Sequence, residues 1–432
     1  MVELDALRAA FDRPLPRHPV PARSIVDKLR ELAAPGLVST GGPRYFGFVI
    51  GGAVDAALCA DLLATGWDQV GFNAVSSPAA AVAEEVAGGW LKDLLCIPAG
   101  ATAGFVTGGQ AANTTALLAA RHHLLRAAGW DVERDGLMGA PPIRVVAGAE
   151  RHVTIDRSLR FIGLGTTSVV EVAADGNGAM RAERLASVLA ESDAPTIVCA
   201  QAGNVNTGAC DDLRTICDAA AARSAWVHVD GAFGLWAAAS PRTRQLVDGI
   251  ELADSWACDG HKWLNVPYDS GFVFCAHPDA HVAALSFTAA YLTGHGAPGV
   301  VSPSDLVPES SRRARGFAVW AALQSLGRSG VADLVDRCCA LARRFAEQLD
   351  KVDGFEVVND VVLNQVLVRL GDDQETDHII DAAQRDGTCW FGGTTWHGMR
   401  LARLSVSNWS TTEDDVDCSV AAIVRLADEA RR

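Results

Sequence analysis

The sequence predicts an α/β protein with a mostly parallel central sheet flanked by helices, followed by a smaller C-terminal α+β domain. The first observation is a series of short apolar runs without polar alternation, which is typical of parallel strands buried on both faces. The second is that helix-like segments separate several of these runs, as in repeated strand–helix units. The third is a change of pattern after about residue 312, where a long helical segment precedes new strand signals.

The elements of the central region follow one another in a regular order. An apolar run at 103–107 leads into a glycine turn, and helical spacing then continues to Gly129. The further strands that we expect are 143–149, 168–174, 195–203, 225–231, 254–260 and 270–276. The helices that we expect between several of them are 154–163, 181–190, 211–223 and 240–249.

The N-terminal region has a different character. Residues 1–45 mix short helical patterns with Pro and Gly, which indicates an arm and not a core. Helical patterns follow at 53–70 and 78–96, and Pro78 stands where a proline can begin a helix.

The C-terminal region begins with the long helical segment after residue 312. Strand signals follow at 355–369 and 400–407, and a closing helix is expected at 412–431. The predicted divisions are an N-terminal arm and helical segment at 1–84, a large α/β domain at 85–311 and a small α+β domain at 312–432.

Composition restricts the class of protein. The chain has 432 residues, of which 49% are hydrophobic and 21% charged, as in ordinary globular proteins. Its net charge of −15 disfavours binding to the phosphate backbone of nucleic acid. The 11 cysteines include no Cys-x-x-Cys pair, so a reducing cytoplasm is expected and a zinc site is not. We expect neither a signal peptide nor a membrane span, because no long apolar run is present.

Polar residues follow several of the expected strands at their carboxyl ends, where open parallel sheets bind ligands. The first such feature is Gly108-Gly109-Gln110, which precedes a helix. The unpaired N–H groups and positive dipole of a helix start attract an anion such as phosphate. Neither a P-loop nor a dinucleotide-binding pattern is present, and a plain glycine turn is the alternative.

Asp230 ends the apolar run at 225–231. A buried carboxylate at a strand end needs a cationic partner, although an Asp that caps the following turn is the simpler alternative. His228 lies on the same face of the strand, which would suit a metal pair. No third ligand with suitable spacing accompanies the two, so we expect no metal.

Lys262 lies between His261 and Trp263, just after another expected strand. A lysine among aromatic and apolar neighbours can become a nucleophile toward carbonyl groups, whereas an isolated lysine usually lies on the surface. His152 follows the strand at 143–149. A lone histidine of this kind is more often a structural hydrogen-bonding residue than a catalyst.

Taken together, these features match pyridoxal 5'-phosphate. This cofactor requires an anion site for its phosphate, a lysine for its aldehyde and a carboxylate beside its ring nitrogen, which makes the ring an electron sink. Along the chain the glycine turn comes first, followed by His152, Asp230 and Lys262. The same order is found in fold-type-I pyridoxal phosphate enzymes.

The chain resembles the group II pyridoxal-phosphate-dependent amino-acid decarboxylases, which include aromatic-L-amino-acid and glutamate decarboxylases. The motifs that carry the resemblance extend over most of the chain. They are "GPRYFGFVIGG", "SSPAAAVAEEVAGGWL", "HVDGAFGLWA", "ADSWACDGHKWLNVPYDSG" and "LARLSVSNWSTTEDDVD".

The resemblance implies a role for each site residue. Lys262 would form the Schiff base and transfer protons, Asp230 would pair with the pyridine nitrogen, and His152 would stack on the ring near the substrate carboxylate. The other implied contacts are Ala232 under the ring, Gly108, Gly109 and Gln110 at the phosphate, His261 at the phosphate or the lysine, and Asn204 at the phenolic oxygen. Arg403 would bind a substrate carboxylate, and a structural role is the alternative.

The resemblance implies a homodimeric lyase that removes the α-carboxylate of an L-amino acid as CO2. The alternatives are another reaction with the same cofactor (aldol-type cleavage, decarboxylation-linked oxidative deamination or transamination) and a scaffold without turnover. Two departures bear on the reaction. The family usually has a Tyr on a mobile loop, whereas the corresponding region has only Tyr291 at its start. Asp259-Gly260 replaces the usual Asn-Pro before the His-Lys pair, and Gln110 replaces a hydroxyl residue.

Overall fold

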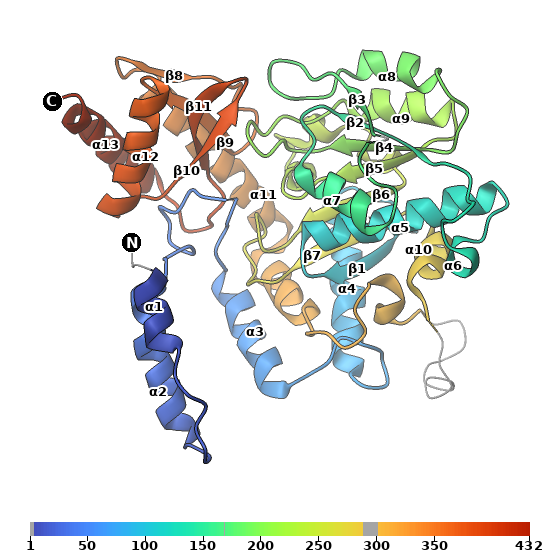
Figure 1. Cartoon of the computed structure of the whole chain (residues 1–432), viewed down its shortest axis with the longest axis horizontal. Helices are drawn as coiled ribbons and strands as arrows, with labels where there is room; N and C mark the ends of the chain where they lie inside the picture. Colours follow the sequence, from blue (N-terminus) through green and yellow to red (C-terminus); the bar gives the residue numbers. More distant parts are fainter. Residues whose placement is uncertain (1–3, 168, 288–300) are drawn as a thin grey trace.

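The computed structural model describes residues 4–167, 169–287 and 301–432. In this part of the chain a seven-stranded sheet has the order β1-β7-β6-β5-β4-β2-β3 (Figure 1). Six of its strands run in the same direction, and β7 runs opposite to them, pairing antiparallel with β1 and β6. The strands are β1 (Thr102–Val106), β2 (Arg144–Gly148), β3 (Val169–Val172), β4 (Thr196–Gln201), β5 (Trp226–Asp230), β6 (Ser255–Asp259) and β7 (Gly271–Cys275). The predicted fold class is confirmed.

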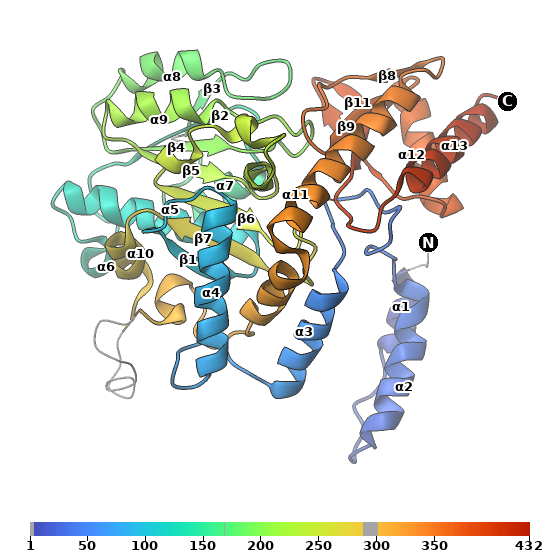
Figure 2. The same ribbon diagram turned by 180° about the vertical axis from the view of Figure 1, so that it is seen from behind.

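Helices cover both faces of this sheet. α5 and α7 lie in front of the strands in Figure 1, and α4 and α11 lie in front in Figure 2, which shows the opposite side. The bounds are α3 (Asp55–Trp67), α4 (Pro78–Leu94), α5 (Gly109–Ala127), α6 (Val132–Asp135), α7 (Val153–Phe161), α8 (Ala182–Leu189), α9 (Leu213–Ala221), α10 (Pro278–Leu285) and the 3-10 turn η6 (Pro303–Leu306). Strands β4, β5, β6 and β7 are almost completely buried, which explains their unbroken apolar sequences.

A second, antiparallel sheet of order β10-β11-β9-β8 forms in the C-terminal region of the described chain. Its strands are β8 (Phe355–Val357), β9 (Gln365–Leu370), β10 (Gly392–Trp396) and β11 (Met399–Ser405), with helices α12 (Asp373–Asp386) and α13 (Glu413–Ala430). The long α11 (Gly316–Leu349) packs against α3 and α4 and also reaches β9 and α13 (Figure 2). It therefore connects the two sheets, and it bends at Gly327, whose φ is 62°.

The N-terminal helices α1 (Leu4–Phe11) and α2 (Ala22–Ala33) form a hairpin that projects from the rest of the molecule (Figure 1). None of the residues of these two helices is buried. Ile25, Val26 and Leu29 on α2 are exposed apolar side chains. Within the described residues, no helix combines the length and apolar character that a membrane crossing requires.

One expectation about local structure was wrong, and one strand was not expected. The segment 240–249 is not a continuous helix, since η2 (Gly234–Ala239) and η3 (Arg244–Val247) are short 3-10 turns. The Ser240 hydroxyl donates to Asp336 and accepts from the N–H of Arg242, which holds a turn where the helix was expected. The strand signal at 355–369 is two strands, β8 and β9, and β10 was not expected. Ser168, where one strand was expected to begin, lies outside the described residues.

Candidate active site

Asp230 and Lys262 belong to neighbouring strand ends. Asp230 is the last residue of β5, and Lys262 lies three residues after the end of β6. Backbone hydrogen bonds continue beyond the paired strands, from Gly231 N–H to Ala257 O and from Asp259 N–H to Ala232 O. Both side chains therefore start from the same carboxyl edge of the sheet, where parallel sheets bind ligands.

Asp259, the last residue of β6, pairs with the lysine. Its Oδ2 lies 3.1 Å from Lys262 Nζ, and its Oδ1 lies 3.6 Å from His261 Nε2. Asp259 is buried, and its Oδ1 has no hydrogen-bond partner among the described residues. A buried carboxylate oxygen without a donor is costly, so this edge of the site suits a group that can donate a hydrogen bond.

The glycine turn lies directly beside Asp259. Gly108 precedes α5 and Gly109 begins it. A Cβ on Gly108 would lie 2.8 Å from His261 Cε1, and a Cβ on Gly109 would lie 3.0 Å from Asp259 Oδ2 and 3.5 Å from Ala232 Cβ. A side chain at Gly108 would require His261 to move, and one at Gly109 would crowd Asp259, the partner of Lys262. The start of α5 therefore lies close to the lysine, and its first N–H groups have no partner within the helix.

Gln110 is directed elsewhere. Its Nε2 donates to Ser158 Oγ at 2.7 Å and to Thr154 O at 3.3 Å, both on α7. Its Oε1 is buried without a hydrogen-bond partner among the described residues. The side chain thus links α5 to α7, and a contact from Gln110 to phosphate stays a prediction for its backbone N–H.

Asp230 is buried and accepts two hydrogen bonds. Asn113 Nδ2 donates to Oδ2 at 3.0 Å, and the backbone N–H of Ala232 donates to Oδ1 at 3.2 Å. Asn113 comes from the buried face of α5, so the helix that begins at the glycine turn also holds the carboxylate. Neither donor is a cation, which leaves Asp230 able to pair with a protonated ring nitrogen.

His152 caps the N-terminus of α7, where its Nδ1 accepts from the N–H of Thr154. Burial lowers the pKa of His152, and the charges of Lys262 and Arg403 lower it further, whereas Asp230 raises it. These three charged groups therefore lie within electrostatic range of one imidazole. The structure thus brings together His152, Asp230, Lys262 and Arg403, which the sequence had selected separately.

His261 stacks on Tyr268, with ring centroids 4.3 Å apart. Its Nδ1 accepts from the N–H of Ser270 at 3.1 Å, and burial lowers its pKa. The neutral ring therefore carries its proton on Nε2, the atom that faces Asp259. This arrangement fixes the turn that carries Lys262.

Arg403 reaches the site from β11 of the second sheet. Its Nη1 donates to the carbonyl of Val205 at 3.2 Å, and burial lowers its pKa. No carboxylate in the described ranges forms an ion pair with it. Val205 follows Asn204, whose amide donates to Glu150 O and accepts from the N–H groups of Asn206 and Thr207. Asn204 therefore organises its own loop, and its contact with the cofactor stays a prediction.

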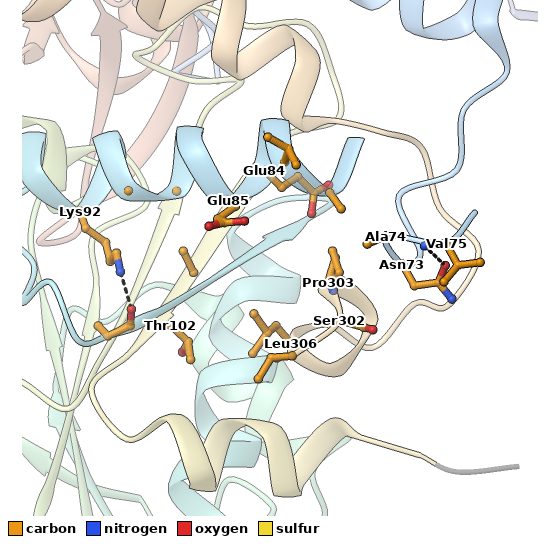
Figure 3. Close-up of a pocket in the computed structure, with 17 residues that line it drawn as sticks. Asn73, Ala74, Val75, Glu84, Glu85, Lys92, Thr102, Ser302, Pro303 and Leu306 are labelled. Carbon is orange, nitrogen blue, oxygen red and sulfur yellow. Dashed lines mark hydrogen bonds between the residues drawn. The ribbon is translucent and has the colours of Figure 1, made fainter. Parts of the chain in front are cut away.

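A separate cavity of about 850 Å³ lies beside α4, β1 and residues 301–306 (Figure 3). Lys92 points along its wall and donates to the carbonyls of Ala99 and Ala101 at 2.7 Å. Glu84 at its margin forms a buried, bidentate ion pair with Arg312. Lys92 and Glu84 are thus engaged in structural contacts, and the cavity contains none of the residues that the sequence had selected.

Sequence reasoning missed three residues of the site. Asn113 and Thr154 lie within helices, where single polar residues carry no distinctive signal. Asp259 had been noted as a departure from the family, but not as the partner of Lys262. Tyr291 lies outside the described residues.

Comparison with known proteins agrees with this geometry. Residues 5–371 match the family described as the pyridoxal-dependent decarboxylase conserved domain. The chain belongs to this family. It is thus a pyridoxal-phosphate-dependent enzyme of the carboxy-lyase class, and the predicted family and cofactor are confirmed.

The relatives include enzymes with different products. Tryptophan decarboxylase 1 of Oryza sativa subsp. japonica is 29% identical over 82% of this chain and 71% of its own length. Phenylacetaldehyde synthase of a Rosa hybrid cultivar is 26% identical over 96% of this chain and 86% of its own. The crystal structure of Oryza sativa TDC with PLP and tryptamine has a TM-score of 0.92 at 24% identity, covering 100% of this chain and 93% of that one, and it supports the fold.

Proposed function

We propose that the protein removes the α-carboxylate of an L-amino acid as CO2, with pyridoxal phosphate held by Lys262. The observation that carries the proposal is the meeting of three features at one sheet edge: the Lys262 amine, the Asp230 carboxylate and the glycine-lined start of α5. These are the three groups that this cofactor requires. The Oδ1 of Asp259, which has no hydrogen-bond partner among the described residues, fits a ligand group that can donate a hydrogen bond there.

Each residue has a proposed task. Lys262 would hold the cofactor aldehyde and carry a proton, while Asp230 would pair with the pyridine nitrogen and Ala232 would contact the ring. Gly108, Gly109 and the backbone of Gln110 hold the phosphate. The bound cofactor withdraws electrons from the bond that breaks at the substrate Cα. His152 and Arg403 orient the substrate so that the bond to its carboxylate is the one that breaks.

Arg403 supports this assignment because it is a half-buried cation without a carboxylate partner in the described residues. A cation of this kind gains free energy when an anion enters. A substrate carboxylate supplies such an anion.

The second candidate is decarboxylation linked to oxidative deamination, which yields an aldehyde. It is favoured by the composition of the chain, whose three tyrosines are Tyr45, Tyr268 and Tyr291. The matches to two relatives named phenylacetaldehyde synthase, from Rosa and from Arabidopsis thaliana, cover 86% and 85% of those two proteins. A proton donor missing from the loop would leave the carbanion open to reaction with oxygen.

An amino-acid panel distinguishes the candidates. Purified protein with pyridoxal phosphate is incubated with each L-amino acid, and CO2, amine, ammonia, peroxide and aldehyde are measured. The proposal predicts equal amounts of CO2 and amine without ammonia or peroxide. Aldehyde, ammonia and peroxide formed together with CO2 would establish the second candidate. If no amino acid yields CO2, and the Lys262→Ala variant behaves like the wild type, the proposal is wrong.

We further propose that the protein is a homodimer. The exposed apolar residues Ile25, Val26 and Leu29 on α2 support this, because isolated two-helix hairpins rarely keep such side chains in water. Light scattering of the full chain would then give twice its mass. The double variant Val26→Glu, Leu29→Glu should weaken the dimer, whereas Arg23→Glu on the same helix serves as the matched control. A monomeric wild type would exclude the dimer.

A further inference from the structure

A chain of buried side chains runs beneath Asp230 to the opposite end of β5. Trp226 Nε1 lies 2.9 Å from Ser255 Oγ, and Ser255 Oγ lies 3.0 Å from His228 Nδ1. His228 Nε2 lies 2.9 Å from Asn113 Oδ1, and Asn113 Nδ2 lies 3.0 Å from Asp230 Oδ2. All five side chains are buried. The contacts therefore form one continuous path from an indole to the carboxylate.

The donors in this path have a single consistent direction. An indole N–H only donates, so Ser255 Oγ accepts from Trp226 and its own hydrogen is free to bond His228 Nδ1. Burial lowers the pKa of His228 to about 4, which keeps the ring neutral near pH 7. With Nδ1 as acceptor, the proton of His228 is on Nε2 and is donated to Asn113 Oδ1. The amide of Asn113 is thereby oriented with its NH2 group toward Asp230.

A branch of the same path reaches His152. Asn113 Nδ2 also donates to Thr154 Oγ1 at 3.2 Å, which leaves the Thr154 hydroxyl hydrogen for His152 Nδ1, 2.8 Å away. The backbone N–H of Thr154 donates to the same Nδ1 at 3.3 Å. His152 Nδ1 is therefore an acceptor, and the proton of the neutral ring is on Nε2.

We propose that Asn113 is the positioning residue of the site, oriented by His228, and that it holds Asp230 directly and fixes the tautomer of His152 through Thr154. One NH2 hydrogen of Asn113 bonds Asp230 and the other bonds Thr154, which in turn bonds His152. Asp230 and His152 are therefore both positioned by the same amide. The consequence for His152 is a defined Nε2–H donor, which suits a substrate carboxylate. The roles of Asp230 and His152 toward cofactor and substrate rest on the proposed function.

The physical reason for a directional chain is that a carboxylate beside a ring nitrogen needs its other lone pairs occupied. An amide in the flipped orientation would present Oδ1 to Asp230, which would repel the carboxylate. His228 prevents this flip because its Nε2–H accepts no hydrogen bond. The chain thus fixes the direction of one donor without placing a second charge near Asp230.

The first test is NMR of the cofactor-free protein labelled with 15N-histidine, in which protonated and unprotonated ring nitrogens have well-separated signals. The proposal predicts Nε2–H tautomers for His228 and His152 at pH 7, assigned by loss of one signal pair in His228→Gln and His152→Gln. Thr154→Val leaves only the longer backbone N–H contact to His152 Nδ1, so it should weaken the preference for the Nε2–H tautomer, and Thr154→Ser should restore it. A wild type with the proton on Nδ1 of either ring would overturn the proposal.

The second test is the affinity for pyridoxal phosphate, measured by equilibrium titration of the cofactor-free protein. Asn113→Leu should weaken binding at least about tenfold, because Asp230 loses a donor in a buried site. Thr115→Val is the matched control: Thr115 is buried on the same helix and bonds only its own helix carbonyl at Ala111 in the described structure. Equal affinities for Asn113→Leu and Thr115→Val would overturn the positioning role.

The tests distinguish this inference from the proposed function. If the wild type binds the cofactor but forms no CO2 from any amino acid, the proposed function is wrong. The histidine tautomers still show whether the hydrogen bonds from Trp226 to Asp230 have the proposed direction. If Asn113→Leu does not fold, the histidine tautomers of the wild type and of the Thr154 variants test the proposed role of Asn113 on their own. Reversed tautomers in an active wild type would contradict the chain and leave the function standing.

Discussion

Lys262 Nζ lies 3.1 Å from Asp259 Oδ2, beside the glycine-lined start of α5. The carboxylate also lies over the glycines at the start of α5, where the cofactor phosphate is expected. In the cofactor-free protein Asp259 is therefore the counter-ion of the lysine. A cofactor held by Lys262 would compete with this carboxylate for the lysine, and a phosphate at the glycines would be repelled by it.

The first prediction follows from this pairing. Asp259→Asn should strengthen pyridoxal phosphate binding by about tenfold, since it removes repulsion from the phosphate and a competing partner of Lys262. Equilibrium titration of the cofactor-free protein measures the change. Asp269→Asn, which removes a carboxylate bound to Arg315, serves as the control. Weaker binding in Asp259→Asn would mean that the carboxylate supports the cofactor.

The second prediction concerns Arg403. Arg403→Leu should raise KM for the best amino-acid substrate by about 100-fold, because a buried charge-assisted contact with a carboxylate is worth about 1.5–3 kcal/mol. The amine that corresponds to this substrate lacks the α-carboxylate, and its inhibition constant separates α-carboxylate binding from general damage. An unchanged KM would mean that Arg403 has only a structural role, as the donor to the Val205 carbonyl.

The third prediction concerns pH. His228 has its pKa lowered to about 4 by burial, from an ordinary value of 6.5. As pH falls through 6.5 the unfolded chain binds a proton that the folded chain does not, so stability present above pH 6.5 is lost toward pH 4. The unfolding free energy of the wild type relative to His228→Gln should fall by about 3 kcal/mol between pH 7 and 4. Urea unfolding at both pH values measures it, and a constant difference would contradict the account.

The fourth prediction concerns Glu84 and Arg312, the buried ion pair between α4 and the segment before α11. Removing one partner leaves the other charge buried, so Glu84→Ala should lower the unfolding free energy by about 3–5 kcal/mol. The exposed pair Arg328 and Asp93 provides a control, since Asp93→Ala should cost less than about 1 kcal/mol. Similar decreases in the unfolding free energy of Glu84→Ala and Asp93→Ala would contradict the larger contribution expected from the buried ion pair.

The sequence was sufficient to predict those parts of the site that lie at strand ends. Asp230 and Lys262 each follow an apolar run, and parallel strands bring their carboxyl ends to one edge. Asn113 could not be predicted in this way, because its partner Asp230 is 117 positions away and a single amide in a helix has no pattern. The contact depends on how α5 packs on the sheet, which periodicity does not specify.

Contacts with other segments explain where the expected secondary structure differs from the observed one. At 240–249 the hydrogen bonds of the Ser240 side chain outweigh a moderate helical pattern. β10 consists of Gly-Gly-Thr-Thr-Trp, and it becomes a strand because β11 offers a pairing edge. In both cases tertiary context decides a segment whose own preference is weak.

The most direct test of the central claim is to identify the residue that holds the cofactor. The chain has four lysines, which are Lys28, Lys92, Lys262 and Lys351, so the assignment is unambiguous. The protein is saturated with pyridoxal phosphate, reduced with borohydride and digested, and the modified peptide is identified by mass spectrometry. We predict a single modification, at Lys262, and none in Lys262→Ala. Modification of another lysine instead, or of none, would contradict the account.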